Sequence, residues 1–178
     1  MTEQNHPHST TEKFITAYND MMERVKTGIE MVEHDVAPRL HHAVDKAQGL
    51  AMELGELTHE EAEKIGNYLK RDIEDAAEYL AGPKGQELHD WLQFDLQQIE
   101  EQVFASFLSV ADQTKLDLMK LEQQAANTSV YHSGEITGIG TLACSECGQQ
   151  IHFNKAKHIP PCSNCNNRVF IRRIDDKL

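Results

Sequence analysis

The sequence predicts a mainly α-helical protein that ends in a small β module. Three observations support this fold class. Aromatic residues make up only 6% of the 178 residues, and glycine and proline are few, a composition typical of long helices. Apolar residues recur every three or four positions through most of the chain, which is the period of an amphipathic helix. All four cysteines fall between residues 144 and 165.

The helical part begins after a polar tail at residues 1–10, which we expect to be disordered. Apolar residues then recur at helical spacing from Phe14 to Val36, until Pro38 interrupts the pattern. The helix either kinks at this proline or restarts with Asp35 as its cap. The pattern resumes from Leu40 and continues to Leu57.

A third helix is predicted after Gly55, where Thr58 and Glu61 have the spacing of a capping box. This helix should reach Leu80, and a fourth helical segment should run from about Glu87 to Ala126. A helix of that length would span roughly 60 Å, which favours dimerisation. Single amphipathic helices are unstable in water. We therefore expect an elongated antiparallel helical bundle or coiled coil.

The net charge of −12 is unevenly distributed. Residues 141–178 contain six basic and three acidic residues, and the rest of the chain contains eleven basic and 26 acidic residues. The helices should therefore repel nucleic acid. Contact with nucleic acid is expected only through the C-terminal module.

The cysteines form two Cys-x-x-Cys pairs, Cys144 with Cys147 and Cys162 with Cys165, separated by fourteen residues. Each pair can direct two sulfurs from one tight turn toward the same ion, and four thiolates leave no open position for water. The chain shows no secretory signal and no membrane span, so we expect a cytoplasmic location, where thiols stay reduced. We predict one structural zinc ion per chain; rubredoxin-type iron and disulfides are the alternatives.

The residues around the cysteines predict a zinc ribbon. Gly148 permits a tight turn, and Ile151, Phe153 and Phe170 supply short strands and a very small core. Such a module needs the free energy of metal binding, on the order of 10 kcal/mol or more, to fold. The predicted organisation is a tail at 1–10, an acidic helical domain at 11–129, a zinc ribbon with a lead-in strand at 130–174, and a tail at 175–178.

The residues leave two alternative functions open. Rubrerythrin-type di-iron enzymes need paired Glu-x-x-His motifs, and the chain has only the pair Glu56 and His59, across the predicted turn. Binding of nucleic acid or a partner at a basic edge of the ribbon is the second alternative. Its candidate contacts are Arg168, Phe170, Arg172 and Arg173.

Four segments carry a family resemblance, residues 55–61, 69–74, 131–136 and 138–142. Together they resemble the proteobacterial zinc-ribbon-containing family of unknown function, the YbeL-like group. The resemblance implies a mostly helical protein with a C-terminal zinc ribbon and no established activity. It also singles out Tyr131, His132 and Glu135, which we expect to pack the ribbon against the helices.

The sequence therefore predicts a non-enzymatic adaptor or binding protein. The acidic helices would mediate homodimer formation or contact a partner protein. The ribbon would dock on a protein or nucleic-acid assembly. A nucleic-acid-binding regulator and a rubrerythrin-like enzyme remain the alternatives.

Overall fold

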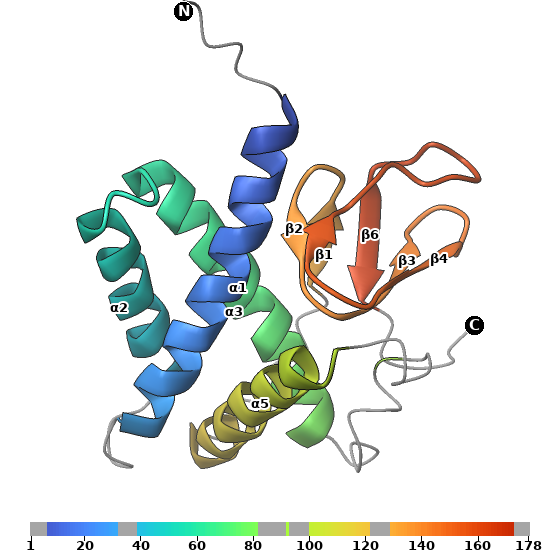
Figure 1. Ribbon diagram of the computed structural model, residues 1–178. Coiled ribbons are helices and arrows are strands. Elements are labelled where there is room, and N and C mark those ends of the chain that lie inside the picture. The colour runs from blue at the N-terminus through green and yellow to red at the C-terminus, as the bar shows by residue number, and fades with distance from the viewer. Residues whose placement is uncertain (1–6, 32–38, 82–91, 93–99, 122–128, 173–178) are drawn as a thin grey trace, which may run out of the picture.

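A computed structural model describes residues 7–31, 39–81, 92, 100–121 and 129–172. These residues form four helices followed by two small antiparallel sheets (Figure 1). The helices are α1 (Pro7–Met31), α2 (Arg39–Glu53), α3 (His59–Ala81) and α5 (Glu101–Leu121). The strands are β1 (Val130–His132), β2 (Ile136–Thr137), β3 (Gly140–Cys144), β4 (Gln150–Phe153), β5 (Lys157–His158) and β6 (Val169–Arg172).

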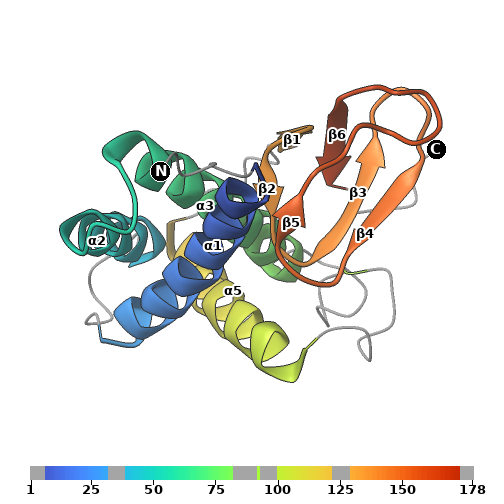
Figure 2. The ribbon, with the colours of Figure 1, turned by 45° about the horizontal axis from the view of Figure 1, so that its top comes forward.

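The C-terminal module contains a four-stranded sheet with the order β1-β6-β3-β4 and a separate β2-β5 pair. Strand β6, the last strand in the described part of the chain, therefore lies inside the larger sheet, between β1 and β3. Both views place the β2-β5 pair beside α1, on the side of the module that meets the helices (Figures 1 and 2). The fold class predicted from the sequence, a helical bundle followed by a zinc ribbon, is confirmed.

The turn between α2 and α3 follows the local signals in the sequence. Gly55 adopts a positive φ of 69°, and the capping box predicted at the start of α3 is present. The Thr58 backbone N–H donates to the Glu61 carboxylate at 2.9 Å, and the Glu61 N–H donates to the Thr58 hydroxyl at 3.3 Å. Ion pairs from Arg24 to Glu56 and from Lys13 to Glu61 join α1 to this turn.

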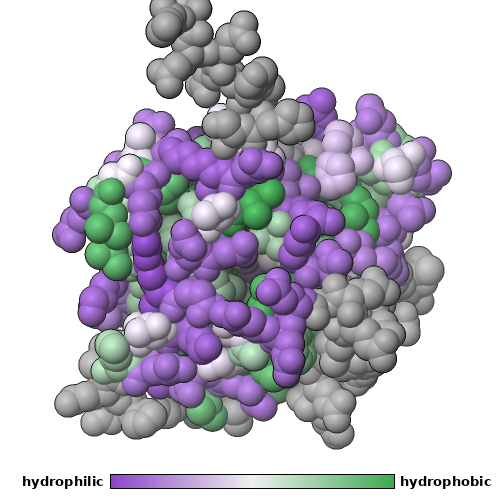
Figure 3. All heavy atoms as spheres, viewed as in Figure 1, coloured by the Kyte–Doolittle hydropathy of each residue, from purple (hydrophilic) through white to green (hydrophobic). Residues whose placement is uncertain are grey.

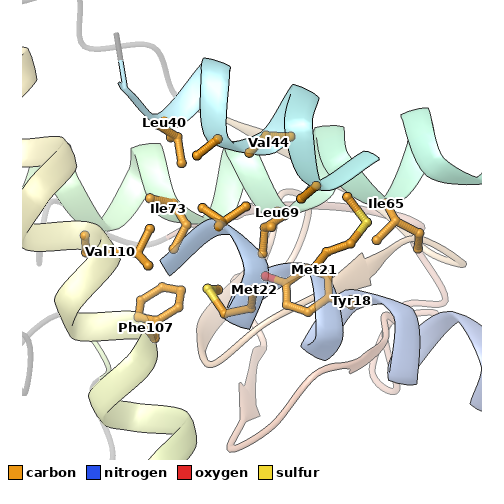
Figure 4. Close-up of a cluster of buried hydrophobic side chains, with 14 of the residues drawn as sticks. Tyr18, Met21, Met22, Leu40, Val44, Ile65, Leu69, Ile73, Phe107 and Val110 are labelled. Carbon is orange, nitrogen blue, oxygen red and sulfur yellow. The ribbon is translucent and has the colours of Figure 1, made fainter. Parts of the chain in front are cut away.

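The main hydrophobic core lies between the four helices (Figure 4). Met21 on α1, Val44 on α2, Leu69 on α3 and Phe107 on α5 are almost fully buried in it. The same core includes three residues of the C-terminal module, Ile136, Ile139 and Ala156. The ribbon is thus packed on the helices through a shared apolar core.

The ribbon also has a small core of its own. Its buried residues share inward positions on the larger sheet and its connecting loops, and they are Tyr131, Leu142, Cys144, Phe153, Ile159, Cys162 and Phe170. The outer surface is different: the face in Figure 3 is largely hydrophilic, with a small apolar patch over the end of α2. None of the described helices is long and apolar enough to cross a membrane.

Two details of the helical prediction are corrected. Helix α1 already begins at Pro7, inside the tail expected at residues 1–10; proline is well suited to a first helical turn because it needs no intrahelical N–H bond there. The predicted continuous helix from Glu87 to Ala126 is also wrong, because Glu100 is not helical. The expected break at Pro38 falls at residues 32–38, outside the described part.

Candidate metal centre and the junction behind it

The four cysteines come together at the end of the ribbon that carries the two tight turns. Their sulfur atoms all lie within 4.8 Å of one another. The Sγ atoms of Cys144 and Cys165 are 3.5 Å apart, and those of Cys147 and Cys162 are 3.6 Å apart. Zn–S bonds of about 2.3 Å in a tetrahedron require sulfur separations of about 3.8 Å. The four side chains therefore fit a single metal ion.

Each cysteine turn is closed by its own backbone. In the first turn, the Gly148 N–H donates to the Cys144 carbonyl at 3.0 Å, and Gly148 has the predicted positive φ, here 72°. In the second turn, the Asn166 N–H donates to the Cys162 carbonyl at 2.9 Å. Asn166 has a φ of 60°, a conformation that asparagine tolerates better than most residues. The two turns thus use different residues for the same left-handed position.

The polar surroundings prepare the first turn for a cation. Burial opposes ionisation of the Cys144 thiol, but the backbone N–H groups of Cys147 and Glu146 and the Asn167 amide lower its pKa to about 6. The pKa of Cys165 is raised to about 12 despite the Asn167 N–H, because local desolvation and the neighbouring sulfurs disfavour a second thiolate. Without a metal ion, the four sulfurs therefore do not all ionise at neutral pH.

This donor set is that of a structural zinc site. Four cysteine thiolates satisfy the tetrahedral preference of Zn²⁺ and leave no ligand position for water or substrate. The ion would stabilise the thiolates and join the two turns, which stabilises the fold and gives no site for hydrolytic chemistry. The four cysteines Cys144, Cys147, Cys162 and Cys165 are the residues that would hold it.

Behind the metal centre, Arg172 at the end of β6 is buried among residues of the helices and the ribbon. Its exposed fraction is 3%. Its guanidinium donates to the Asp72 carboxylate at 3.2 Å, to the Tyr131 hydroxyl at 2.9 Å and to the Thr137 hydroxyl at 3.2 Å. It also lies 3.6 Å from the Asp75 carboxylate. Arg172 therefore joins the last strand to helix α3.

The two carboxylates of α3 accept further hydrogen bonds. Asp72 accepts from the Tyr18 hydroxyl of α1 at 2.7 Å and from the Gly138 backbone N–H at 2.6 Å. Asp75 accepts from the Tyr131 hydroxyl and from Ser129. We call the set Tyr18, Asp72, Asp75, Tyr131, Thr137 and Arg172 the junction network.

A second arginine, Arg71, covers the solvent side of this network. Its guanidinium lies 3.7 Å from the centre of the Tyr131 ring, which is a cation–π contact. It also donates to the Glu135 carboxylate at 2.6 Å and to the backbone carbonyl of Ile136 at 3.3 Å. The expected role of Tyr131 and Glu135 in packing the ribbon against the helices is thus observed, whereas His132 stays exposed and contacts Glu135.

Burial and charge shift the titration of the junction network. Burial raises the pKa of Asp75 above its ordinary value, although Arg172, Ser129 and Tyr131 act to lower it. Burial also raises the pKa of Tyr131 and of Tyr18, helped by Asp72. Burial alone would lower the pKa of Arg172, but Tyr131 and the two aspartates raise it. The arginine therefore stays charged while both tyrosines stay neutral and donate hydrogen bonds.

The burial of Arg172 and Phe170 corrects the predicted basic contact edge. Both side chains are on the inner face of β6, because alternate residues of a strand face the same side, and Phe170 is 0% exposed. Neither can reach a nucleic acid or a partner from there. Arg168 is exposed, and Arg173 lies outside the described residues.

The sequence interpretation missed Asp72 and Asp75. The signal that could have found them is their position: Asp72 directly precedes the buried Ile73, and Asp75 directly precedes the buried Ala76, so both border the apolar stripe of α3. Charged side chains at such positions need partners. The alternation of side chains along β6 would likewise have placed Arg172 on the same side of the strand as Phe170.

The residues considered for a di-iron site do not come together in the described part of the chain. Glu56 binds Arg24 in a bidentate ion pair, and His59 is exposed at the start of α3. Over the described ranges, the four cysteines form the one group of His, Cys, Asp and Glu side chains with metal-binding spacing.

Comparisons with known proteins agree with this architecture. The family model described as "Zinc-ribbon containing domain" matches residues 27–174. The chain is 27% identical over 131 residues to "Uncharacterized protein YbeL" of Escherichia coli strain K12, which covers 73% of this chain and 79% of that protein. The proteins of the same name from strains O6:H1 and O157:H7 give the same values. No solved structure matches the chain.

The family match covers both sides of the junction, because residues 27–174 include helix α3 as well as the four cysteines and strand β6. The zinc ribbon and the helix on which it is packed are therefore parts of one matched region. The chain belongs to the family defined by this zinc-ribbon containing domain.

Proposed function

We propose that this protein is a non-enzymatic binding protein whose zinc ribbon and acidic helices present one rigid surface to a partner protein. The observation that carries the proposal is the junction network, in which Arg172 is buried against Asp72 and Asp75 of α3. A ribbon held in this way keeps a constant orientation to the helices. A partner can then contact both parts without first ordering them, which lowers the entropic cost of binding.

The exposed end of the ribbon supports this role. Cys147 and Cys165 are exposed, and so are the polar residues beside them, Ser145, Ser163 and Asn164. The metal-binding turns therefore face solvent while the opposite side of the ribbon is buried on the helices. Short polar side chains on a metal-stiffened loop suit a protein contact that uses hydrogen bonds.

The charge of the helices indicates a basic partner surface. A cavity of about 240 Å³ lies where α1 and the start of α5 meet the ribbon, and its wall includes the carboxylates of Asp20, Glu23 and Glu100. Apolar side chains, Val103 and Ile139 among them, also line it. A lysine or arginine side chain of a partner would match both the apolar wall and the negative charge.

The proposal is tested by crosslinking the purified zinc-loaded protein in a lysate of its host and identifying the crosslinked partner by mass spectrometry. We expect one dominant protein partner, with crosslinks from both the helices and the ribbon. Neutralising the cavity by Asp20→Asn, Glu23→Gln and Glu100→Gln should reduce recovery of that partner at least about tenfold, because charge complementarity is lost.

The matched control neutralises three exposed acidic residues elsewhere, Glu12→Gln, Glu63→Gln and Asp112→Asn. It removes the same charge and should retain the partner. Equal losses in both variants would contradict a site at the cavity. Recovery of nucleic acid instead of a protein, or of no specific partner, would contradict the proposed function itself.

Self-association through the helices is a second mode of binding that we propose. Leu50 in the last turn of α2 and Leu54 directly after this helix are 41% and 60% exposed and lie four residues apart, about one helical turn. Light scattering coupled to size-exclusion chromatography should give a dimer mass that Leu54→Lys reduces to that of a monomer. A wild-type monomer at high concentration would contradict this mode.

A further inference from the structure

Strand β6 connects the metal centre directly to the junction network. It begins at Val169, four residues after the last cysteine, and ends at Arg172. Its neighbour β3 ends at the first cysteine, and Cys144 pairs with Phe170 across the two strands. A metal ion that orders the cysteine turns therefore also orders β6, the strand that carries Arg172.

Asn167 is the residue that joins the two cysteine turns to the start of β6. Its backbone carbonyl accepts from the Cys162 N–H at 2.9 Å. Its side-chain amide donates to the Cys144 sulfur at 3.5 Å and to the Ser145 hydroxyl at 2.9 Å. In addition, the Ser145 N–H donates to the Val169 carbonyl at 3.1 Å. These contacts tie the start of β6 to both turns, in addition to its pairing with β1 and β3.

At the other end of β6, Arg172 is the cation that compensates two buried carboxylates. The side chains of Asp72 and Asp75 are 0% and 3% exposed. Among the described residues, Arg71 is the other cation near them, at 3.7 Å from Asp72, but its guanidinium is already bound to Glu135. If β6 alone left its place, with β1 and β2 still packed on α3, the two carboxylates would stay buried without their main partner, which is strongly unfavourable.

Helix α3 connects the two aspartates to the rest of the helical domain, so the loss of Arg172 also affects that domain. The apolar stripe that Asp72 and Asp75 border carries Ile65, Leu69 and Ile73, which lie in the main core with residues of α1, α2 and α5. Tyr18 of α1 also donates to Asp72. A disturbance at Asp72 therefore reaches two helices at once.

From this connection we infer that zinc occupancy of the ribbon controls the order of the helical domain, through Arg172. With zinc bound, β6 places Arg172 between Asp72 and Asp75, and α3 is stable. When zinc is lost, the cysteine turns and β6 lose their order, Arg172 leaves the interior, and α3 opens around the uncompensated aspartates. The protein thus contains a metal-dependent conformational switch whose output is the helical surface.

The test is hydrogen–deuterium exchange of the full-length protein before and after removal of zinc by a chelator. We expect exchange in the peptides of α3 that carry Asp72 and Asp75 to become at least about tenfold faster without zinc, as in a sub-global opening. Added zinc should restore protection. Unchanged exchange in α3, while β6 exchanges rapidly, would overturn the inference.

A triple variant separates the role of charge from that of simple ribbon packing. Arg172→Met with Asp72→Asn and Asp75→Asn keeps the approximate volumes but removes all three charges. Chelation of zinc should speed up hydrogen exchange in its α3 much less than in the wild type.

The matched control Arg24→Met breaks an exposed ion pair on the other side of the domain. Exchange in its α3 should respond to chelation as in the wild type. A triple variant as zinc-sensitive as the wild type would also overturn the inference. If the variant does not fold, the wild-type comparison decides alone.

Discussion

The guanidinium of Arg172 lies 3.2 Å from the carboxylate of Asp72, although the two residues are 100 positions apart in the chain. One belongs to the last strand of the ribbon and the other to the third helix. Their contact, surrounded by Tyr131, Thr137 and Asp75, joins the two parts of the protein in its interior. The ribbon is therefore not an appendage that moves freely on the helices.

Replacing Arg172 by methionine should destabilise the whole protein. The substitution leaves Asp72 and Asp75 buried without their main counter-charge, and removal of one partner from a buried ion pair costs about 3–5 kcal/mol. The free energy of unfolding from urea titration measures the effect. The control is Arg168→Met on the exposed side, which should change that free energy by less than about 0.5 kcal/mol. Similar small values for both variants would contradict a stabilising role of the junction.

Gly138 should not tolerate a larger side chain. A Cβ atom there would lie 2.7 Å from the Tyr18 hydroxyl, which is itself bound to Asp72 and cannot easily move aside. We expect Gly138→Ala to destabilise by roughly 1–3 kcal/mol, the usual range for overpacking. Gly49→Ala is the matched control, since nothing lies within 4 Å of its Cβ position in α2, and it should stabilise by about 0.5–1 kcal/mol. Calorimetry measures the Tm of both variants, and a Tm that changes in the same direction for Gly138→Ala and Gly49→Ala would contradict the expectation.

The raised pKa of Asp75 predicts a pH dependence with a definite sign. Because the folded protein holds this proton more tightly than the unfolded chain, Asp75 contributes stability that is present at low pH and is lost as pH rises through its folded pKa. The stability of the wild type relative to Asp75→Asn should therefore increase as pH falls from 7 toward 4. Comparing the two proteins cancels the titration of other carboxylates. A difference that grows with rising pH would be inconsistent with the raised pKa.

The metal centre predicts one zinc ion per chain. Elemental analysis after size-exclusion chromatography should find close to one equivalent of zinc, and Cys162→Ser should lose most of it because the tetrahedral thiolate site is incomplete. Ser163→Ala, next to that ligand but exposed, should keep the full equivalent. Iron in place of zinc in the wild type would contradict this assignment.

The metal ligands and the helix cap could be predicted from the sequence because each depends on residues that are close together in the chain. The cysteine pairs, Gly148 and the capping box of Thr58 and Glu61 each act within a few residues, and the structure contains all of them. Apolar periodicity likewise predicts which side of each helix is buried. These features need no knowledge of the tertiary arrangement.

The junction network could not be predicted in the same way, because its members meet only after folding. Asp72 and Arg172 look like ordinary surface charges when each is considered alone, and this is why Arg172 was interpreted as a contact for nucleic acid. The resemblance to a known family pointed to Tyr131 and Glu135 without giving their partners. Only the tertiary structure shows that Arg71 and Asp75 are those partners.

The central claim, that ribbon and helices form one cooperative unit, is tested most directly by pulsed hydrogen exchange of the zinc-loaded protein at increasing urea concentration. The peptides of α3 and those of β3 and β6 report on the two parts in the same sample. Our account predicts that both lose protection with one common midpoint, as expected for a single cooperative transition. Two separate midpoints, with α3 still protected after β6 has opened, would contradict it.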